Sequence, residues 1–284
     1  MRKTHALLMS LLLGLILVWS IVFQSQYSAH LKISFLDVGQ GDASLISVGN
    51  TQVLIDGGPG SAILAELGKE MPVTDNEIEY MILTHPDSDH LDGLIPVIDR
   101  YKIGKIYLSG VKSTKAAYSI FVEKAQTHKI PIAVSMTGEK LWLSGEDSLV
   151  FLWPGERYLG KDSTDTNSTS IVLRYCHLEK CALFTGDLEQ DGQAEMLRGC
   201  PDKTLLSADI LKVPHHGSVN GLGEEFLTVI KPKIGIISVG KKNGYGHPHQ
   251  AVLSLMKKYE IIINRTDEEG TIRFEYRDGE FIRE

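Results

Sequence analysis

The segment from His85 to His90 places four side chains that can bind a metal ion within six residues. His85, Asp87, Asp89 and His90 directly follow an apolar run that predicts a strand. A strand points successive side chains to opposite faces, whereas the loop at its end can wrap several of them around one ion. Imidazole and carboxylate ligands together suit zinc, manganese or iron(II). The segment therefore predicts part of a metal site.

Two further segments place the same kinds of ligand at the end of an apolar run. Residues 183–187 end in Gly186 and Asp187, and residues 211–218 contain the pair His215 and His216. Three strand ends that carry the same ligand types predict one shared centre, in which two ions could share a bridging carboxylate.

Together with other short motifs, these residues resemble the metallo-β-lactamase superfamily, in the variant where an aspartate replaces the second histidine. They are similar in particular to the extracellular hydrolase domain of competence proteins of the ComEC type, which serve DNA uptake. The resemblance extends from about Leu31 to Tyr276 and implies an α/β fold, the four-layer αββα sandwich. The further motifs that carry it are Gly39-Gln40-Gly41-Asp42, Leu54-Ile55-Asp56-Gly57-Gly58, Asn167-Ser168-Thr169-Ser170, Val213-Pro214-His215-His216-Gly217-Ser218 and Tyr245-Gly246-His247-Pro248-His249.

The resemblance implies one or two divalent ions, zinc or manganese. The ligands it implies are His85 and Asp87 for the first ion, Asp89, His90 and His215 for the second, and Asp187 as the bridge. Asn167 stands in the region where many members carry a further histidine, so the first ion is expected to be held weakly. Asp42 and Asp56 would orient ligands through hydrogen bonds.

Catalytic and substrate-binding roles follow from the chemistry of such a site. Asp89 is expected to accept a proton from the attacking water while it binds metal, and His247 or His249 to protonate the leaving oxygen. The remaining candidates, for substrate contact or support of the ligands, are Asn167, Ser170, His216 and Ser218.

The chain carries a formal net charge of −7, so its overall charge does not attract nucleic acid. A DNA substrate would need metal ions or local cations. Two groups of basic residues could supply these cations. One follows the metal-binding segment and contains Arg100, Lys102, Lys105, Lys112 and Lys115, and the other precedes His247 and contains Lys231, Lys233, Lys241 and Lys242. No aromatic-rich strip of the kind that single-strand binders use is present in the sequence.

The N-terminus predicts a membrane segment. Arg2 and Lys3 precede an uncharged run of 18 residues from Ala6 to Phe23, long enough for a spanning helix. Small residues are poorly placed for cleavage after it, because Tyr27 precedes Ala29 by two positions. We therefore expect residues 1–29 to be an uncleaved anchor, with residues 30–284 a hydrolase domain outside the cell. The alternative is a secreted protein with a cleaved signal peptide.

Three cysteines exclude a fold built on disulfides. Cys176 and Cys181 flank the expected turn at residues 177–180, where they could either pair or remain reduced. Cys200 would then be single.

Short apolar runs divided by glycine and polar loops predict alternating strands and helices around these motifs. No repeat and no long linker divides the chain after the N-terminal segment. The expected strands are 31–36, 43–48, 51–55, 78–84, 105–108, 132–134, 140–143, 148–152, 170–176, 181–185, 210–213, 234–239, 261–264 and 271–276. The expected helices are 61–69, 91–101, 115–128, 189–197, 224–230 and 250–259, and the polar stretch 160–169 predicts a mobile loop.

The sequence thus favours a metal-dependent hydrolase, specifically a phosphodiesterase or nuclease that acts on DNA outside the membrane. Two alternatives remain open. One is a hydrolase of a small ester, lactone, β-lactam or phosphodiester, and the other is a metal-bound binding module without catalysis.

Overall fold

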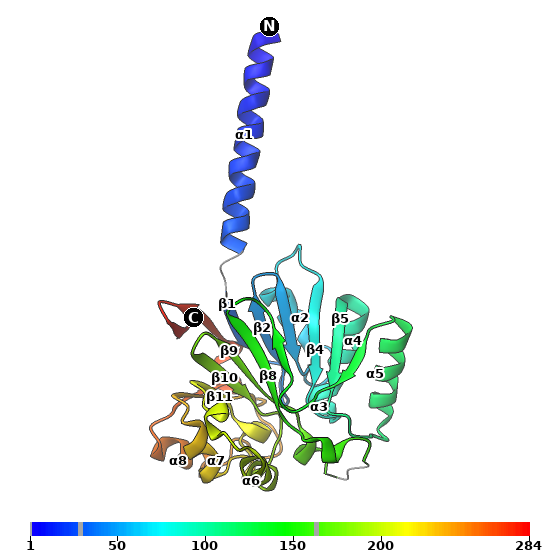
Figure 1. The fold of residues 1–284 in the computed structure, drawn as a ribbon, viewed down its shortest axis with the longest axis vertical. Coiled ribbons are helices and arrows are strands. Elements are labelled where there is room, and N and C mark those ends of the chain that lie inside the picture. The colour runs from blue at the N-terminus through cyan, green and yellow to red at the C-terminus, as the bar shows by residue number, and fades with distance from the viewer. Residues whose placement is uncertain (1, 28–30, 162–164) are drawn as a thin grey trace.

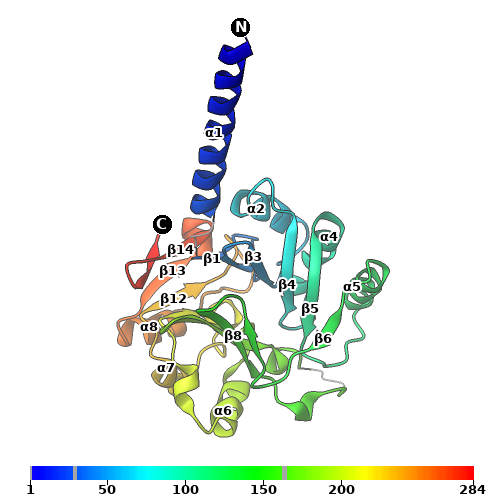
Figure 2. The same ribbon diagram turned by 45° about the horizontal axis from the view of Figure 1, so that its top comes forward.

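Two β-sheets face each other, and helices cover both outer faces, so the molecule has four layers (Figures 1 and 2). The computed structural model describes residues 2–27, 31–161 and 165–284. The expected αββα sandwich is confirmed by this arrangement.

The first sheet has eight strands and contains most of the N-terminal half of the domain. Its order across the sheet is β15 (Glu280–Arg283), β14 (Ile272–Arg277), β1 (Leu31–Phe35), β2 (Ser44–Val48), β3 (Thr51–Ile55), β4 (Glu77–Leu83), β5 (Lys102–Leu108) and β6 (Ile132–Val134). The second sheet has seven strands, in the order β13 (Ile262–Arg265), β12 (Ile234–Ile237), β11 (Ile210–Lys212), β10 (Lys180–Phe184), β9 (Val172–His177), β8 (Asp147–Trp153) and β7 (Lys140–Trp142).

Helices on the two outer faces differ in their place along the chain. Those beside the first sheet are α2 (Ala62–Glu70), α3 (Ser88–Leu91), α4 (Leu94–Arg100) and α5 (Ala116–Thr127). Those that follow the strands of the second sheet are α6 (Gln190–Gly199), α7 (Glu224–Ile230), α8 (Gln250–Lys258) and α9 (Thr266–Glu269). Short 3₁₀ turns are η1 (Glu156–Tyr158), η2 (Asn167–Thr169), η3 (Lys203–Leu206) and η4 (Pro214–Gly217).

Three hydrophobic clusters hold these layers together. The middle cluster lies between the sheets, where the rings of Phe35 and Phe184 stack with centroids 5.7 Å apart. The outer clusters join each sheet to its helices, for example through Phe121 of α5 and Phe226 of α7. Burial of such side chains contributes about 1.5–3 kcal/mol each, so the sheets form a rigid support for the loops at their edge.

The strands that lead to the predicted ligands all end at the same edge of the sandwich. Parallel pairing of β3 with β4, and of β10 with β11, brings the carboxyl ends of these strands together within each sheet. Across the two sheets, the backbone N–H of Ile171 donates to the carbonyl oxygen of Thr84 at 3.0 Å. The loops after the four strands therefore meet between the sheets.

Close backbone contacts at this edge explain one of the glycine motifs. Gly41 has φ +152°, and a Cβ atom there would lie 2.3 Å from the carbonyl oxygen of Asp89. The neighbouring N–H of Asp42 donates to that same oxygen at 3.0 Å. A side chain at position 41 would thus push apart the two loops that carry Asp42 and Asp89.

Several element boundaries differ from the prediction. The helix expected over 91–101 is two helices, α3 and α4, with Gly93 between them, because the chain there packs directly on Gly57. Strand β5 begins at Lys102 rather than at 105, and β15 and α9 were not predicted. The prediction of a mobile loop over 160–169 falls partly on residues 162–164, which lie outside the described residues, while 167–169 form η2.

Helix α1 (Arg2–Tyr27) stands apart from the two sheets in Figure 1. Across the residues that the structure describes, no helix combines the length and the apolar character needed to span a bilayer. The membrane anchor therefore stays a prediction.

Candidate metal centre

Four side chains from three loops meet at the common edge of the sheets. Asp89, His90, Asp187 and His216 each place one ligand atom within 4.8 Å of the others. His90, Asp187 and His216 are buried, and Asp89 is half-buried at the floor of a cleft of about 450 Å³. One carboxylate from each half of the sandwich and two imidazoles form a donor set suited to zinc, manganese or iron.

One oxygen of Asp187 is the centre of this cluster. Its Oδ2 lies 3.3 Å from Nε2 of His90, 3.5 Å from Nε2 of His216 and 3.8 Å from Nε2 of His215. Asp187 follows Gly186, whose φ of +49° turns the chain sharply after β10. This turn points the carboxylate between the sheets.

Hydrogen bonds at Nδ1 hold Nε2 of His90 and Nε2 of His216 toward Asp187. Nδ1 of His90 donates to Oδ2 of Asp56 at 2.8 Å, and Nδ1 of His216 donates to the carbonyl oxygen of Ser238 at 2.9 Å. Because both oxygens can only accept, the proton on each Nδ1 is fixed, as is usual behind metal-binding histidines.

Asp56 supports a third imidazole through a hydroxyl group. Thr84 Oγ1 donates to Oδ2 of Asp56 at 2.7 Å. Because its proton is used in this way, Thr84 Oγ1 can accept a hydrogen bond from Nδ1 of His85 at 3.1 Å. Burial raises the pKa of the Asp56 carboxyl against the opposing attraction of His90. A single buried side chain thus orients both His85 and His90, in the supporting position that the sequence predicts for it.

Unpartnered polar atoms show that the donor set fits a metal ion. Nε2 of His85 and Nε2 of His90, on rings whose centroids lie 4.1 Å apart, are buried and make no hydrogen bond to any described residue. Buried polar atoms without partners are rare and costly, so such a group at one point indicates a ligand. Each is an atom type that binds divalent ions.

Protonation of the rings leads to the same interpretation. Burial, reinforced by the neighbouring His90, lowers the pKa of His85 to about 3. Burial also lowers the pKa of His216, but the carboxylates of Asp187 and Asp42 outweigh it and raise that pKa to about 10. The carboxylates therefore attract positive charge into the cluster, and metal ions would replace these protons.

The predicted first ion position is less compact. Nε2 of His85 lies 3.8 Å from Oδ1 of Asp87, and that oxygen accepts hydrogen bonds from Lys115 Nζ at 2.6 Å and from Thr166 Oγ1 at 2.5 Å. Asn167 lines the same cleft, and its Nδ2 donates to Glu189 Oε1 at 3.5 Å. No compact cluster forms here among the described residues.

The rings of the two adjacent histidines both lie close to Asp187, with Nε2 of His215 at 3.8 Å and Nε2 of His216 at 3.5 Å from its Oδ2. His216, expected to contact substrate, is in the four-residue cluster, whereas His215, expected as a ligand, is not. Nδ1 of His215 lies 2.8 Å from Oε1 of Glu189, without hydrogen-bonding geometry. Both residues have left-handed backbone, with φ of 49° and 51°, and this turn directs His216 inward.

The two histidines proposed as acids, His247 and His249, differ in whether they line the cleft. His247 lines the cleft, its ring lies 5.7 Å from that of His215, and burial lowers its pKa. His249 is instead the N-cap of α8, where its Nδ1 accepts from the N–H of Ala251 at 3.4 Å. His249 is not among the residues that line the cleft, so its expected catalytic role is not supported by the geometry.

The other supporting residues lie below the cleft. Ser170 Oγ is 3.2 Å from Nδ1 of His85 and accepts from the N–H of Asp187 at 3.1 Å. Asp42 is buried, with Oδ1 3.2 Å from Nδ1 of His216. Ser218 is buried and does not line the cleft, so it is not placed to contact substrate.

Most of the basic residues considered for DNA lie away from the cleft. Lys102 pairs with Glu77 at the start of β4, the end opposite His85, and Lys105 is beside Tyr107. Of that group, Lys115 reaches the site through Asp87. Lys241 and Lys242 are exposed on the loop that leads to the cleft residues Tyr245 and His247.

Sequence reasoning missed three residues of the site, namely Glu189, Lys212 and Tyr245. Glu189 comes two positions after Asp187, a spacing that signals nothing in a single sequence. Tyr245 lines the cleft with 75% of its surface exposed. Lys212 did carry a signal, because it is a charged residue at the end of an otherwise apolar strand.

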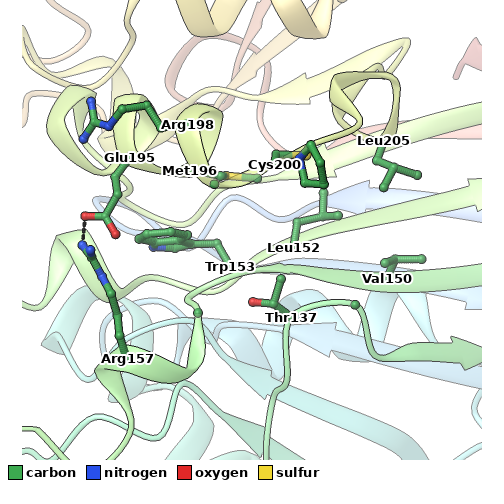
Figure 3. Close-up of a pocket in the computed structure, with 14 residues that line it drawn as sticks. Thr137, Val150, Leu152, Trp153, Arg157, Glu195, Met196, Arg198, Cys200 and Leu205 are labelled. Carbon is green, nitrogen blue, oxygen red and sulfur yellow. Dashed lines mark ion pairs between the residues drawn. The ribbon is translucent and has the colours of Figure 1, made fainter.

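A larger cavity lies elsewhere in the second sheet. It has a volume of about 580 Å³ and is lined mainly by apolar side chains of β8 and α6, with an ion pair between Arg157 and Glu195 beside Trp153 (Figure 3). The metal-capable residues of the cleft are absent from its lining. It is therefore separate from the candidate centre.

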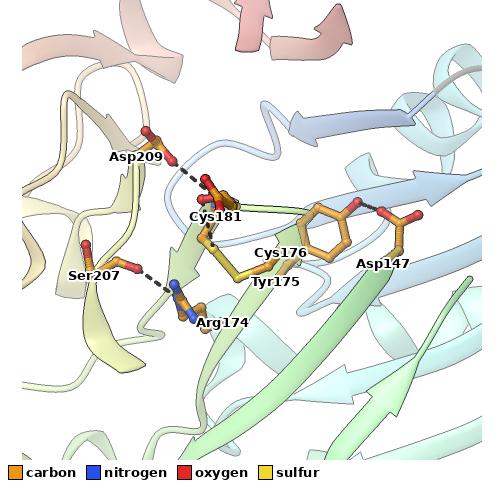
Figure 4. Close-up of a disulfide and its surroundings, with 8 residues drawn as sticks. Asp147, Arg174, Tyr175, Cys176, Cys181, Ser207 and Asp209 are labelled. Carbon is orange, nitrogen blue, oxygen red and sulfur yellow. Dashed lines mark hydrogen bonds between the residues drawn. A yellow bond between two sulfur atoms is a disulfide. The ribbon is translucent and has the colours of Figure 1, made fainter. Parts of the chain in front are cut away.

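A disulfide joins Cys176 and Cys181 across the hairpin of β9 and β10 (Figure 4). The two residues are paired in register, with Cα atoms 4.2 Å apart, so of the two possibilities left open by the sequence the structure contains the bonded one. Beside it, Asp147 accepts hydrogen bonds from Tyr175 and from Nδ1 of His177, the latter at 2.9 Å.

This fold and site match a known family. Residues 36–241 match the family model of the metallo-beta-lactamase superfamily, and the chain belongs to that superfamily of metal-dependent hydrolases. The metal-dependent hydrolase expected from the sequence is confirmed at this level.

The similar curated proteins are competence proteins, as the resemblance implied. The chain is 29% identical over 269 residues to ComE operon protein 3 of Bacillus subtilis, which covers 88% of this chain and 34% of that protein. It is 29% identical over 243 residues to competence protein ComA of Neisseria gonorrhoeae, covering 85% of this chain and 32% of that protein. The chain thus spans about a third of the length of these relatives.

Solved structures support the fold. The metallo-beta-lactamase fold protein YhfI of Bacillus subtilis superposes with a TM-score of 0.57 at 14% identity, over 87% of this chain and all of that one. CmlA, a diiron beta-hydroxylase from Streptomyces venezuelae, has a TM-score of 0.54 at 15% identity, over 88% of this chain and 54% of that one.

Proposed function

We propose that this chain is a metal-dependent phosphodiesterase that cleaves DNA on the outer side of the cell membrane. The observation that carries the proposal is the cluster of Asp89, His90, Asp187 and His216, with unpartnered ligand atoms, at the floor of an open cleft. The similarity to competence proteins supports a DNA-related substrate.

The ligands of the proposed centre come from both halves of the sandwich. Asp89, His90, Asp187 and His216 would hold one ion, and His85 with Asp87 the other. Bound ions supply a nucleophilic hydroxide and offset the negative charge that develops on a phosphodiester.

Asp89 and His247 are placed for the two proton transfers. Asp89 Oδ2 accepts from Nε2 of His216 at 3.2 Å, and the half-buried carboxylate faces the cleft, where it can take a proton from water. His247 lines the same cleft, with its ring centroid 6.4 Å from that of His216 and an unpartnered Nδ1. It is positioned to exchange a proton with the leaving oxygen.

The rim of the cleft supports a nucleic-acid substrate. Tyr245 is an exposed ring at the cleft, with its plane 26° from that of His247, and Lys241 and Lys242 precede it on the same loop. A single ring beside exposed cations is enough to stack one base and attract the backbone, although it is not the aromatic strip whose absence the sequence shows. This arrangement fits binding without sequence specificity.

The outer side of the membrane is part of the proposal. The disulfide between Cys176 and Cys181 supports an oxidising compartment, where such bonds persist. The basic residues before the apolar run of the N-terminal segment favour an anchor with its start in the cytoplasm. Protease treatment of intact cells should degrade the hydrolase domain, and its protection would contradict this placement.

Activity is tested with the purified full chain, loaded separately with manganese and zinc. Single- and double-stranded DNA, bis(p-nitrophenyl) phosphate and a nitrocefin-type β-lactam are the substrates. We expect metal-dependent cleavage of DNA that is lost in Asp89→Ala but kept in Asp99→Ala, an exposed carboxylate paired with Lys124. Cleavage of bis(p-nitrophenyl) phosphate or nitrocefin alone would contradict the DNA assignment, and metal binding without any cleavage would favour a binding module.

Tyr245→Ala separates a nucleobase-bearing substrate from a bare phosphodiester. Loss of one stacked base costs about 1–3 kcal/mol, so KM for DNA should rise about 5- to 150-fold. Hydrolysis of bis(p-nitrophenyl) phosphate should be unchanged. Equal effects on both substrates would argue against stacking.

A further inference from the structure

Lys212 is a buried cation beneath the candidate metal centre. Only 2% of the residue is exposed, at the end of the buried strand β11. Its Nζ forms an ion pair with Asp42, lies 3.7 Å from Oδ1 of Asp187 and donates to the carbonyl oxygen of Gly186 at 3.0 Å. All of these partners are acceptors, so the amine is held as an ammonium group that cannot bind a metal ion.

The two oxygens of Asp187 therefore face different cations. Oδ2 faces the imidazoles of His90, His215 and His216, at 3.3–3.8 Å. Oδ1 faces Lys212 and has no hydrogen bond to any described residue. A metal ion would therefore approach Asp187 from the side of Oδ2 and the imidazoles, while Lys212 lies on the side of Oδ1.

We infer that Lys212 is a permanent counter-charge of the metal centre, which keeps the site folded when no ion is bound and weakens the binding of ions. Unpaired buried carboxylates are strongly destabilising, and Lys212 partners two of them, Asp42 and Asp187. The same positive charge repels a divalent ion that approaches Oδ2 of Asp187. The inference rests on the metal centre and not on the identity of the substrate.

Lys212→Met in the full chain tests both halves of the inference. Without ions, its melting temperature should fall by several degrees relative to the unsubstituted chain. The dissociation constant for Zn²⁺ or Mn²⁺, from isothermal titration calorimetry, should become smaller by about tenfold or more. The rise in melting temperature that saturating metal produces should grow accordingly.

Arg273→Met is the matched control. Arg273 of β14 pairs with the buried Glu70 of α2 at 2.6 Å. Neither residue belongs to the metal cluster. Loss of Arg273 should also lower the melting temperature without ions, but the dissociation constant for metal should stay within about twofold.

The double variant Asp42→Asn with Lys212→Met keeps the test valid if the single variant fails to fold. It removes both partners of the ion pair between Lys212 and Asp42 and leaves the net charge of the site unchanged, so its metal affinity should return close to that of the unsubstituted chain. Unchanged affinity in Lys212→Met would overturn the inference, and weaker affinity would show that Lys212 positions ligands instead. Absence of metal binding in the unsubstituted chain would overturn the proposed function, whereas metal binding that Lys212→Met leaves unchanged would overturn the inference alone, so the two failures are distinguishable.

Discussion

Two buried groups of aspartate and histidine lie at opposite ends of the hairpin β9–β10, and they differ in how completely they are bonded. At the turn, Asp147 accepts from Tyr175, His177 and Ser144. At the other end, Nε2 of His90 lies 3.3 Å from Asp187 Oδ2 and has no hydrogen bond to any described residue.

The difference separates a structural network from a ligand site. Both groups contain a buried carboxylate and an imidazole, so composition alone does not distinguish them. Burial of polar atoms is tolerated where partners satisfy them, as around Asp147, whereas unsatisfied atoms that converge on one point require a partner from outside the chain. The comparison predicts that substitutions at the two ends have opposite consequences for metal binding and for stability.

Loss of the central carboxylate gives the largest expected effect. Asp187→Asn keeps the size of the side chain but removes the charge that faces three imidazoles. Substitutions behind a ligand cost about 10- to 100-fold in metal affinity, and removal of the ligand itself should cost at least as much. Calorimetric titration of the variant with Zn²⁺ measures this loss of affinity. Unchanged affinity in this variant would contradict the assignment of the centre.

Asp147→Asn is the counterpart at the turn. Tyr175 and His177 both bond to the carboxylate of Asp147, and the neutral amide of the variant is a weaker acceptor. The free energy of unfolding should therefore fall by about 1–3 kcal/mol. Metal affinity should not change, because no residue of the metal cluster contacts this network. Urea unfolding measures the stability, and metal titration of the same preparation measures the affinity. A shift in metal affinity would show that the two ends of the hairpin β9–β10 are coupled.

Removal of the disulfide also acts at the turn. Replacement of both Cys176 and Cys181 by serine frees a loop with a sequence separation of 5 residues. The chain-entropy estimate for so short a loop is a loss of about 2 kcal/mol in the free energy of unfolding. Stability by chemical unfolding should fall, while the dissociation constant for metal stays the same. If metal affinity falls too, the hairpin transmits strain to Asp187.

The smallest effect is expected from alkaline pH. Burial, together with the hydrogen bond to Asp147, raises the pKa of Tyr175 far above its ordinary value. Its contribution to stability is complete below about pH 10 and is lost as pH rises further, at about 1.4 kcal/mol per pH unit. Tyr175→Phe should lack this loss. Unfolding free energies of the two proteins measured between about pH 9 and pH 11 should therefore converge, and parallel curves would contradict the raised pKa.

The sequence was sufficient to predict the sandwich and the loops that carry the ligands. Apolar runs that end in His85, Asp187 and His215 identify strand ends, and the resemblance supplies the rule that these ends meet. Residues with hydrogen-bonding roles behind the ligands, such as Asp56, were also predicted, because they belong to a recognisable motif.

Sequence reasoning assigned His215 to the metal and His216 to the substrate, whereas His216 belongs to the four-residue cluster of the structure. Which of the two rings enters the cluster depends on the backbone of η4, where both histidines are left-handed. No local sequence pattern indicates that conformation for histidine. Nor could sequence reasoning find the contact of Lys212 with Asp42, which depends on the arrangement of β11 relative to a loop from the other sheet.

The hydrogen bonds around Asp56 have a consequence for how ions enter the centre. Asp56 bonds to His90 directly and to His85 through Thr84, and these two histidines are ligands of different proposed ions. Any shift of the Asp56 carboxylate when one ion binds is passed to the ring that awaits the other. The two binding steps are then thermodynamically linked, and each ion alters the affinity for its neighbour by the same factor.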